Sequence, residues 1–222
     1  MEYDFITFHT VLILILAYFI GSIPTAVCVG KWFYGIDVRD YGSKNAGATN
    51  TIRVLGPRAG VPVFIIDVMK GFLAVNLAYY FCKDDFGTHN EFFAFYEVIL
   101  AFIAILGHVL PIFARFKGGK GIATSLGVTL AMLPDAALVI FVIFTIILFV
   151  SHFVSLSSMI SAFIFPFISY FVFGHDEYAY ILFSIIVTIF IFFTHRKNIR
   201  RLRNGEESKF FFKKKEPLIT KS

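Results

Sequence analysis

The chain alternates between long apolar stretches and short polar segments. The long apolar stretches lie at about 5–29, 59–82, 92–114 and 121–194. A helix needs about 20 apolar residues to cross the hydrocarbon layer of a membrane, so each of the first three stretches predicts one span. The fourth is long enough for several spans. It is divided by Pro134, by the polar residues 151–158 and by the acidic segment 174–178.

The composition also favours a membrane protein. Of the 222 residues, 58% are hydrophobic and 16% are charged, whereas soluble domains carry about 25% charged residues. A formal net charge of +5 is compatible with a nucleic-acid partner. However, lysine and arginine also gather in the cytoplasmic loops of membrane proteins, and we interpret the excess as a topology signal. We therefore expect no nucleic-acid partner.

The distribution of basic residues predicts the orientation. Three regions, 31–58, 115–120 and 196–221, hold 18 of the 20 lysine and arginine residues, so we expect all three to face the cytoplasm. Other connections carry acids, such as Asp84 and Asp176, and fit the opposite face. Because the last two basic regions then lie on the same side, the stretch between them crosses the membrane an even number of times.

Four crossings fit this final stretch, and the first of them is short for a full span. We place them at 121–133, 135–150, 157–173 and 179–194. The predicted fold is an all-α polytopic bundle of seven transmembrane helices, with the N-terminus outside and the C-terminus in the cytoplasm. Five crossings satisfy the same parity and remain an alternative. Residues 1–210 are predicted to form one integral-membrane domain, followed by a basic, disordered cytoplasmic tail at 211–222.

The first basic region contains YGSKNAGATNTIRVLG, residues 41–56. Its hydroxyl, amide and guanidinium groups suit a phosphate ligand, and arginine holds phosphate through two parallel hydrogen bonds. The phosphate-binding candidates in this region are Ser43, Asn45, Thr49, Asn50 and Arg53. The alternative is an ordinary loop in which Asn50 caps a helix that starts at Thr51.

The second basic region reads FKGGKGIATSLG, residues 116–127, and lies between two apolar stretches. Glycine N–H groups could wrap a phosphate while a lysine adds a positive charge, and a helix N-terminus follows at Ile122. The candidates here are Gly118, Gly119, Lys120 and Gly121. The spacing differs from the GxxxxGK[ST] loop of nucleotide-binding proteins. The alternative is a flexible linker whose lysines only fix the topology.

The third basic region begins with HRKNIRRLRNGEESK, residues 195–209. His195 and Asn198 are three positions apart and therefore share one face of a helix. They follow the last predicted span, where side chains meet the membrane interface, and we expect both to belong to the site. The alternative is a basic anchor next to the membrane.

Ionisable residues also occur within the predicted spans, where they are costly and mark functional regions. Asp67 and Lys70 are three positions apart, and we predict an ion pair that orients the second span toward the site. His108 precedes Pro111 and is expected to bond a main-chain carbonyl that the proline leaves without a donor. These three residues are predicted to support the site.

Several motifs occur together, in order, over about residues 10–210. They are GSIPT (21–25), the SxNxGATN run from Ser43 to Asn50 with Arg53, DxxKG (67–71), GHVLP with FKGGKGIAT (107–124), and HRKNIRRLRNGEE (195–207). With these motifs the chain closely resembles the bacterial acyl-phosphate-dependent glycerol-3-phosphate acyltransferases, the PlsY family.

The resemblance implies a reaction. An acyl group would pass from a fatty acyl-phosphate to the 1-hydroxyl of glycerol 3-phosphate, giving lysophosphatidic acid and phosphate, the first acylation of phospholipid synthesis. It also implies a multi-pass protein of the bacterial cytoplasmic membrane, with a seven-span bundle and an active site that faces the cytoplasm. Family members need no metal, acyl-CoA or acyl carrier protein. The site residues that the resemblance implies are Ser43, Arg53, Lys120, His195 and Asn198.

In the expected mechanism, arginine, lysine and glycine N–H groups hold the two phosphates and stabilise the oxyanion. His195 and Asn198 position the glycerol hydroxyl, and Ser43 is a ligand rather than a nucleophile. The proton goes either to the donor's own phosphate or to His195. The expected partners are the two substrates and membrane lipid, with the enzyme that makes the acyl-phosphate as a further candidate. We expect a monomer without a cofactor.

Two other classes can be weighed against this expectation. One large class of glycerolipid acyltransferases uses an HxxxxD pair with histidine as general base, but none of the six histidines has an aspartate five positions later. A transporter for a phosphorylated metabolite is the rival from a different class. It is disfavoured because all three phosphate-friendly loops fall on one face and no inverted repeat is visible.

Overall fold

The structure is a computed structural model that describes residues 8–86 and 91–210. The part of the chain that it describes contains helices and connecting loops and no strands. In chain order the elements are α1 (Phe8–Gly21), α2 (Thr25–Tyr34), η1 (Val38–Asp40), α3 (Ala48–Leu55), α4 (Pro57–Phe86), α5 (Glu91–Val109), η2 (Ile112–Ala114), α6 (Ile122–Met132), α7 (Pro134–Ser151), α8 (Val154–Phe167), the π-helical η3 (Ile168–Val172), α9 (Tyr178–Thr194) and α10 (Arg196–Arg203).

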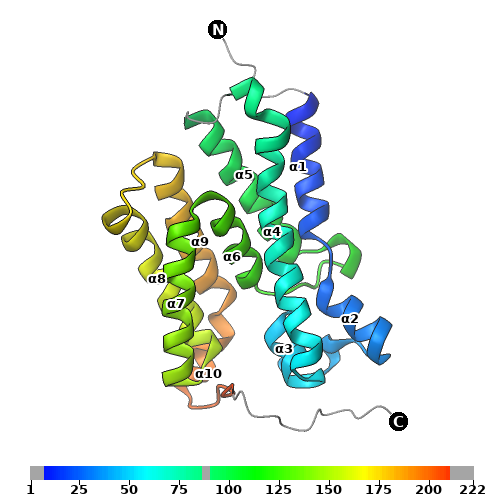
Figure 1. Ribbon diagram of the computed structural model, residues 1–222. Coiled ribbons are helices and arrows are strands. Elements are labelled where there is room, and N and C mark those ends of the chain that lie inside the picture. Colours follow the sequence, from blue (N-terminus) through cyan, green and yellow to red (C-terminus); the bar gives the residue numbers. More distant parts are fainter. Residues whose placement is uncertain (1–7, 87–90, 211–222) are drawn as a thin grey trace.

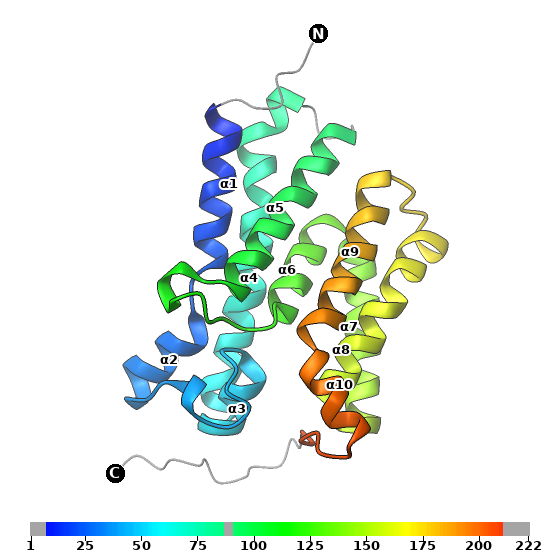
Figure 2. The ribbon, with the colours of Figure 1, turned by 180° about the vertical axis from the view of Figure 1, so that it is seen from behind.

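The long helices form two groups with a short helix between them. Helices α1, α4 and α5 pack together, and so do α7, α8 and α9, while α6 lies between the groups (Figure 1). Both views place α3 and α10 at one end of the bundle, and the loop that leads into α6 lies above α3 (Figure 2). The described parts of the three basic segments of the sequence therefore lie toward the same end.

The contact between α4 and α6 depends on small residues. A Cβ atom at Gly127 of α6 would overlap the main-chain carbonyl of Val68, and one at Gly71 of α4 would overlap the carbonyl of Thr124. Without side chains at these two points the helix backbones approach closely, as is usual where helices pack inside a membrane. This packing holds α6, and hence the loop that precedes it, firmly against α4.

The predicted apolar segments all appear as helices, but their lengths differ. By length and composition four helices could cross a membrane, or up to six if each of two bent pairs is one span. One bent pair is α1 with α2, which meet at 43° across residues 22–24, and the other is α9 with α10, which meet at 59°. The short α6 is an eleven-residue apolar helix. The count of seven crossings and the orientation of the termini remain predictions, and residues 211–222 lie outside the described chain.

Candidate active site

A chain of three side chains joins two of the basic segments. The ammonium group of Lys120, in the loop before α6, donates a 2.6 Å hydrogen bond to Oδ1 of Asn198 in the first turn of α10. The amide of Asn198 in turn donates a 2.6 Å hydrogen bond to Glu207. Because both ends of the amide are committed, the orientation of Asn198 is fixed and Lys120 is held in one place.

The anchor of this chain, Glu207, was not anticipated from the sequence. Its Oε1 atom also accepts a 2.6 Å hydrogen bond from the hydroxyl of Ser155, in the first turn of α8. One carboxylate therefore ties the segment after α10 to α8 and to Asn198. In the sequence Glu207 is one of two adjacent acids in a basic tail, and Ser155 belongs to a polar break between spans. No spacing rule connects them.

Positive charge accumulates around Lys120. Burial lowers the pKa of the Lys120 ammonium to about 8; Glu207 acts in the opposite direction, whereas the charges of Arg201 and Arg53 add to the lowering. Burial likewise lowers the pKa of Arg53, which lies in the last turn of α3. Lys120 and Arg53 are thus partly dehydrated cations, with the charges of the exposed Arg201 and of Glu207 close enough to act on both, as expected where anions bind.

His195 lies at the junction of α9 and α10 and is 2% exposed. Its Nδ1 atom is 2.9 Å from the carbonyl oxygen of Ile191. Because a carbonyl can only accept, Nδ1 must carry the proton, which leaves Nε2 as an acceptor. Burial and the nearby charge of Lys120 lower the pKa of His195 to about 4. The imidazole is therefore neutral near pH 7.

The segment before α3, residues 41–47, is called the first loop, and Asn50 in the first turn of α3 holds its shape. This residue is buried, and its Oδ1 accepts hydrogen bonds from both the main chain and the hydroxyl of Ser43, while its amide donates to the carbonyls of Val38 and Tyr41. The helix begins at Ala48 with Gly47 as its cap, so the alternative in which Asn50 caps a helix from Thr51 is wrong. The amide shapes the loop and has no group left for a ligand.

The other phosphate-binding candidates of the first basic region are less buried than Asn50. Ser43 still has lone pairs available after donating to Asn50, and Asn45 and Thr49 are half-buried beside it. The structure therefore leaves these three side chains as candidates for a phosphate. None of them makes a hydrogen bond to the chain that runs from Lys120 to Glu207.

Two of the glycines expected to bind phosphate are engaged elsewhere. The N–H groups of Gly118 and Gly119 donate 3.2 Å hydrogen bonds to the carbonyls of Val109 and His108, in the last turn of α5. Those carbonyls have no partner within their own helix, and the loop supplies one. These glycines therefore hold the loop in place. Gly121, with φ of +81°, turns the chain into α6.

Arg39, which the sequence suggested only as a topology signal, fastens the same loop from the other side. Its guanidinium group donates hydrogen bonds of 2.9 and 3.1 Å to the carbonyls of Ala114 and Lys117. It also forms a 2.7 Å ion pair with Asp37. The segment before α3 and the loop before α6 are thus joined directly.

Asp67 and Lys70 form the predicted ion pair, with 2.7 Å between Nζ and Oδ1, and both side chains are buried. His108 behaves differently from the expectation. Its Nδ1 atom lies 3.1 Å from the hydroxyl of Thr124 in α6 and 3.7 Å from Asp67, and its ring bonds no carbonyl of the residues that the structure describes. Among the described residues no three His, Cys, Asp or Glu side chains gather as a metal site would require.

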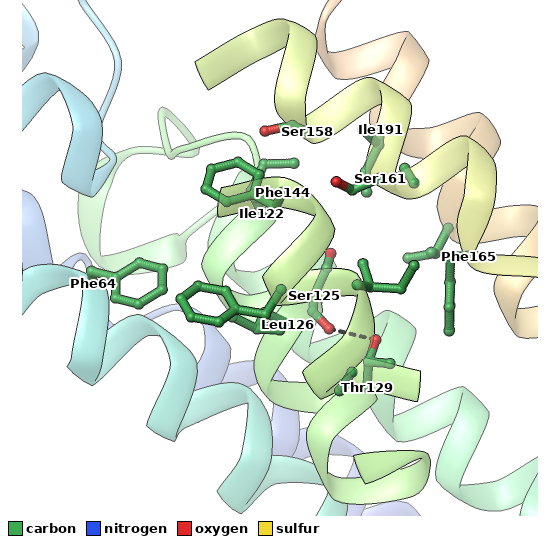
Figure 3. Close-up of a pocket in the computed structure, with 15 residues that line it drawn as sticks. Phe64, Ile122, Ser125, Leu126, Thr129, Phe144, Ser158, Ser161, Phe165 and Ile191 are labelled. Atoms are coloured by element: carbon green, nitrogen blue, oxygen red, sulfur yellow. Dashed lines mark hydrogen bonds between the residues drawn. The ribbon is translucent and has the colours of Figure 1, made fainter. Parts of the chain in front are cut away.

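An apolar groove lies near Lys120 and His195. Its walls are almost entirely apolar, as is usual where a ligand's hydrocarbon part binds. Residues of α6, α7, α8 and α9 line it with Phe64 of α4, and Figure 3 shows Ile122 and Ile191 near one end and Thr129 at the other. Ile122 follows Lys120 by two positions, and the carbonyl of Ile191 is the partner of His195. One end of the groove therefore lies close to Lys120 and His195.

Comparisons with known proteins agree with the resemblance. The family model described as "Glycerol-3-phosphate acyltransferase" matches residues 11–205. A protein named glycerol-3-phosphate acyltransferase from Fusobacterium nucleatum is 45% identical over 199 residues, covering 90% of this chain and 97% of its own length. The protein of the same name from Enterococcus faecalis is 43% identical over 209 residues, covering 91% and 92%.

A solved structure gives the same result in three dimensions. The crystal structure of PlsY, an integral membrane glycerol 3-phosphate acyltransferase in its glycerol 3-phosphate form, superposes with a TM-score of 0.80 at 34% identity, covering 91% of this chain and 96% of that one. The lysophosphatidic acid form of PlsY gives 0.77. With four to six apolar candidate spans, this chain is a multi-pass membrane protein. It belongs to the PlsY family of glycerol-3-phosphate acyltransferases.

Proposed function

We propose that this protein transfers a fatty acyl group from an acyl-phosphate to the 1-hydroxyl of glycerol 3-phosphate, giving lysophosphatidic acid and phosphate. The observation that carries the proposal is the position of Lys120, which lies where cationic groups meet one end of an apolar groove. An acyl-phosphate has this division, because a dianionic head is joined to a long apolar chain. The acceptor adds a second phosphate, which the cations of the same site can balance.

In the proposed complex, the acyl chain lies in the groove and its phosphate lies near Lys120. Arg53 and Lys120 hold the two phosphates, with Ser43 as a further ligand from the first loop. Lys120 also stabilises the negative charge that develops on the carbonyl oxygen. Asn198, whose orientation Glu207 fixes, and His195 then direct the glycerol hydroxyl toward the acyl carbon.

We further propose that the leaving phosphate takes the proton. A general base works best when its pKa lies near the operating pH, and the pKa of His195 is about 4. Neutral Nε2 can accept a hydrogen bond from the hydroxyl but is a weak base. As the hydroxyl oxygen bonds the acyl carbon, the bond from that carbon to the phosphate oxygen breaks, and the proton passes to the phosphate. No covalent enzyme intermediate is needed, because the donor is already an activated anhydride.

The arrangement of basic segments supports a cytoplasmic site. Since 18 of the 20 lysine and arginine residues lie in three regions, and α3, α10 and the loop before α6 gather toward one end (Figure 2), we propose that this end faces the cytoplasm. The proposal includes seven crossings, an outside N-terminus and a location in the bacterial cytoplasmic membrane. The protein acts as a monomer without a metal or cofactor.

An assay of purified protein in detergent tests the function. With palmitoyl-phosphate and glycerol 3-phosphate as the only substrates, we expect lysophosphatidic acid to form, and Lys120→Ala to lower its rate by about 10²–10³-fold. Lys117→Ala is the matched control, because that side chain is exposed in the same loop and should keep the wild-type rate. Formation of no lysophosphatidic acid by folded wild-type protein would reject the proposal.

A further inference from the structure

The buried ion pair between Asp67 and Lys70 does more than join two positions of α4. Besides its partner, Lys70 donates a 2.9 Å hydrogen bond to the carbonyl of Ile23, in the break between α1 and α2. The carboxylate of Asp67 accepts a 2.9 Å hydrogen bond from the hydroxyl of Thr25, at the start of α2. The pair therefore fixes the point at which the first bent helix pair changes direction.

The same pair reaches His108 on α5. The Nδ1 edge of the imidazole is directed toward Thr124 and Asp67, at 3.1 and 3.7 Å. These contacts fix the rotation of the ring. His108 is also buried, with 6% of the residue exposed.

The opposite edge of the ring supports the glycine loop, residues 117–121. A Cβ atom at Gly119 would collide with Nε2 of His108, so the loop backbone lies directly against the imidazole. The main-chain carbonyl of His108 accepts the hydrogen bond from the N–H of Gly119. One residue therefore holds Gly119 by its backbone and limits its position by its side chain. Lys120 is the next residue along the chain.

We infer that His108 is a positioning residue for Lys120, acting through Gly119, and that the ion pair of Asp67 and Lys70 sets the orientation of its ring. This inference rests on the proposed function. In this inference His108 acts through the loop and determines where the ammonium group of Lys120 lies. Displacement of a reacting or charge-stabilising group by about 1 Å can cost ~10²-fold in rate, so a buried support of this kind is consequential.

The test measures kcat/KM for glycerol 3-phosphate against pH. The alkaline limit of the wild type should lie near the pKa of Lys120, about 8. In His108→Ala the loop loses its support and Lys120 gains water. We expect kcat/KM to fall about 10–100-fold. The alkaline limit should lie about one pH unit higher, because burial lowers the pKa of a lysine and a more hydrated Lys120 has a higher pKa. A merely structural defect would reduce the amount of active enzyme without moving this limit.

A pair of substitutions tests the contact itself. Gly119→Ala should impair the enzyme alone, because its new methyl group collides with the His108 ring. In the double variant His108→Ala with Gly119→Ala the collision is relieved, so we expect kcat/KM within about twofold of the His108→Ala value. His108→Gln, which can fill part of the ring's space, should keep more activity than His108→Ala. If His108→Ala does not fold, Gly119→Ala should still shift the alkaline limit upward.

Tyr18→Phe is the matched control. The Tyr18 hydroxyl donates a 2.9 Å hydrogen bond to the carbonyl of Leu110 at the same end of α5, but it does not touch the contact between His108 and Gly119. Its alkaline limit should stay at the wild-type pH. The inference would be overturned if the two single-variant losses in kcat/KM multiplied in the double variant, or if the alkaline limit stayed at the wild-type pH in both single variants. In either case the enzyme would remain an acyltransferase. An inactive wild type would instead reject the proposed function.

Discussion

Lys120 and Asn198 lie 78 positions apart in the chain, and the ammonium group of the first donates a 2.6 Å hydrogen bond to the amide oxygen of the second. The contact joins the loop before α6 to the helix after the last long span. It places a positive charge beside His195, whose pKa that charge helps to lower. A lysine that must bind phosphate is thus held ready before any substrate arrives, which reduces the ordering that binding requires.

Glu207 is expected to be needed for stability and for activity, although a carboxylate has the wrong charge to bind a phosphate. In Glu207→Ala the amide of Asn198 and the hydroxyl of Ser155 both lose their acceptor. An unsatisfied buried donor costs about 1–3 kcal/mol, so we expect lower thermal stability and a fall of about tenfold or more in kcat. Circular dichroism melting and the acyltransfer assay measure the two effects. The neighbouring Glu206 is exposed, and Glu206→Ala should change neither.

The charge state of Lys120 predicts how activity depends on pH. A lysine is positive below its pKa, so phosphate binding is complete below pH 8 and is lost as pH rises through about 8. We expect kcat/KM to fall about tenfold for each pH unit above that value. In Lys120→Arg, whatever its rate, this alkaline limit should disappear, because arginine stays protonated. A limit that persists unchanged in the arginine variant would assign the titration to another group.

Glu207→Gln tests the electrostatic part of the same account. The carboxylate raises the pKa of Lys120, opposing the effect of burial. A glutamine can keep an acceptor at the same position but has no charge. The alkaline limit should therefore move to lower pH in Glu207→Gln, the direction opposite to that expected for His108→Ala. A shift to higher pH would show that the two charges do not interact as the structure indicates.

His195 should be replaceable by another neutral polar residue. The ring donates from Nδ1 to the carbonyl of Ile191 and presents Nε2 as an acceptor. If positioning is its role, His195→Asn or His195→Gln should retain at least about a tenth of the wild-type kcat, whereas His195→Ala should lose ~10²-fold or more. Equal losses in all three variants would instead indicate that His195 takes the proton. The assay is initial rate at saturating substrates.

Asn50 should be required for the shape of the first loop. It makes hydrogen bonds to Ser43, Val38 and Tyr41 from a buried position. We expect Asn50→Ala to destabilise the protein by about 2 kcal/mol or more and to weaken substrate binding through Ser43. Thr49→Ala, at the adjacent half-buried position, should leave the stability nearly unchanged. Melting temperatures of the two variants distinguish a structural amide from a ligand.

The sequence predicted the apolar helices and the pair of Asp67 with Lys70, but not several contacts that hold Lys120 and Asn198 in place. Apolar length located the long helices, because the bilayer sets that length, whereas the number of crossings stays a prediction. The motifs indicated Arg53, Lys120, His195 and Asn198 as site residues. In the structure Lys120 donates a hydrogen bond to Asn198 and interacts electrostatically with Arg53 and His195, while their roles in the reaction stay predictions. Asp67 and Lys70 could be paired from their spacing alone, because i,i+3 positions meet on any helix.

Other features depend on contacts between distant segments. The N–H groups of Gly118 and Gly119 looked available for phosphate, but the carbonyls at the end of α5 compete for them once the chain folds. Glu207 and Ser155 meet only because the chain turns back after α10. In the sequence Arg39 is one more positive residue, but in the structure its hydrogen bonds to two carbonyls hold the glycine loop in place. Local sequence patterns do not predict such contacts between distant segments.

The most direct test of the central claim is the stoichiometry of the reaction with a single donor. Purified protein receives glycerol 3-phosphate and palmitoyl-phosphate, and inorganic phosphate and lysophosphatidic acid are both quantified, with palmitoyl-CoA as the donor in a parallel reaction. The account predicts equal amounts of the two products from palmitoyl-phosphate and neither product from palmitoyl-CoA. Lysophosphatidic acid formed from palmitoyl-CoA, or phosphate released without lysophosphatidic acid, would contradict it.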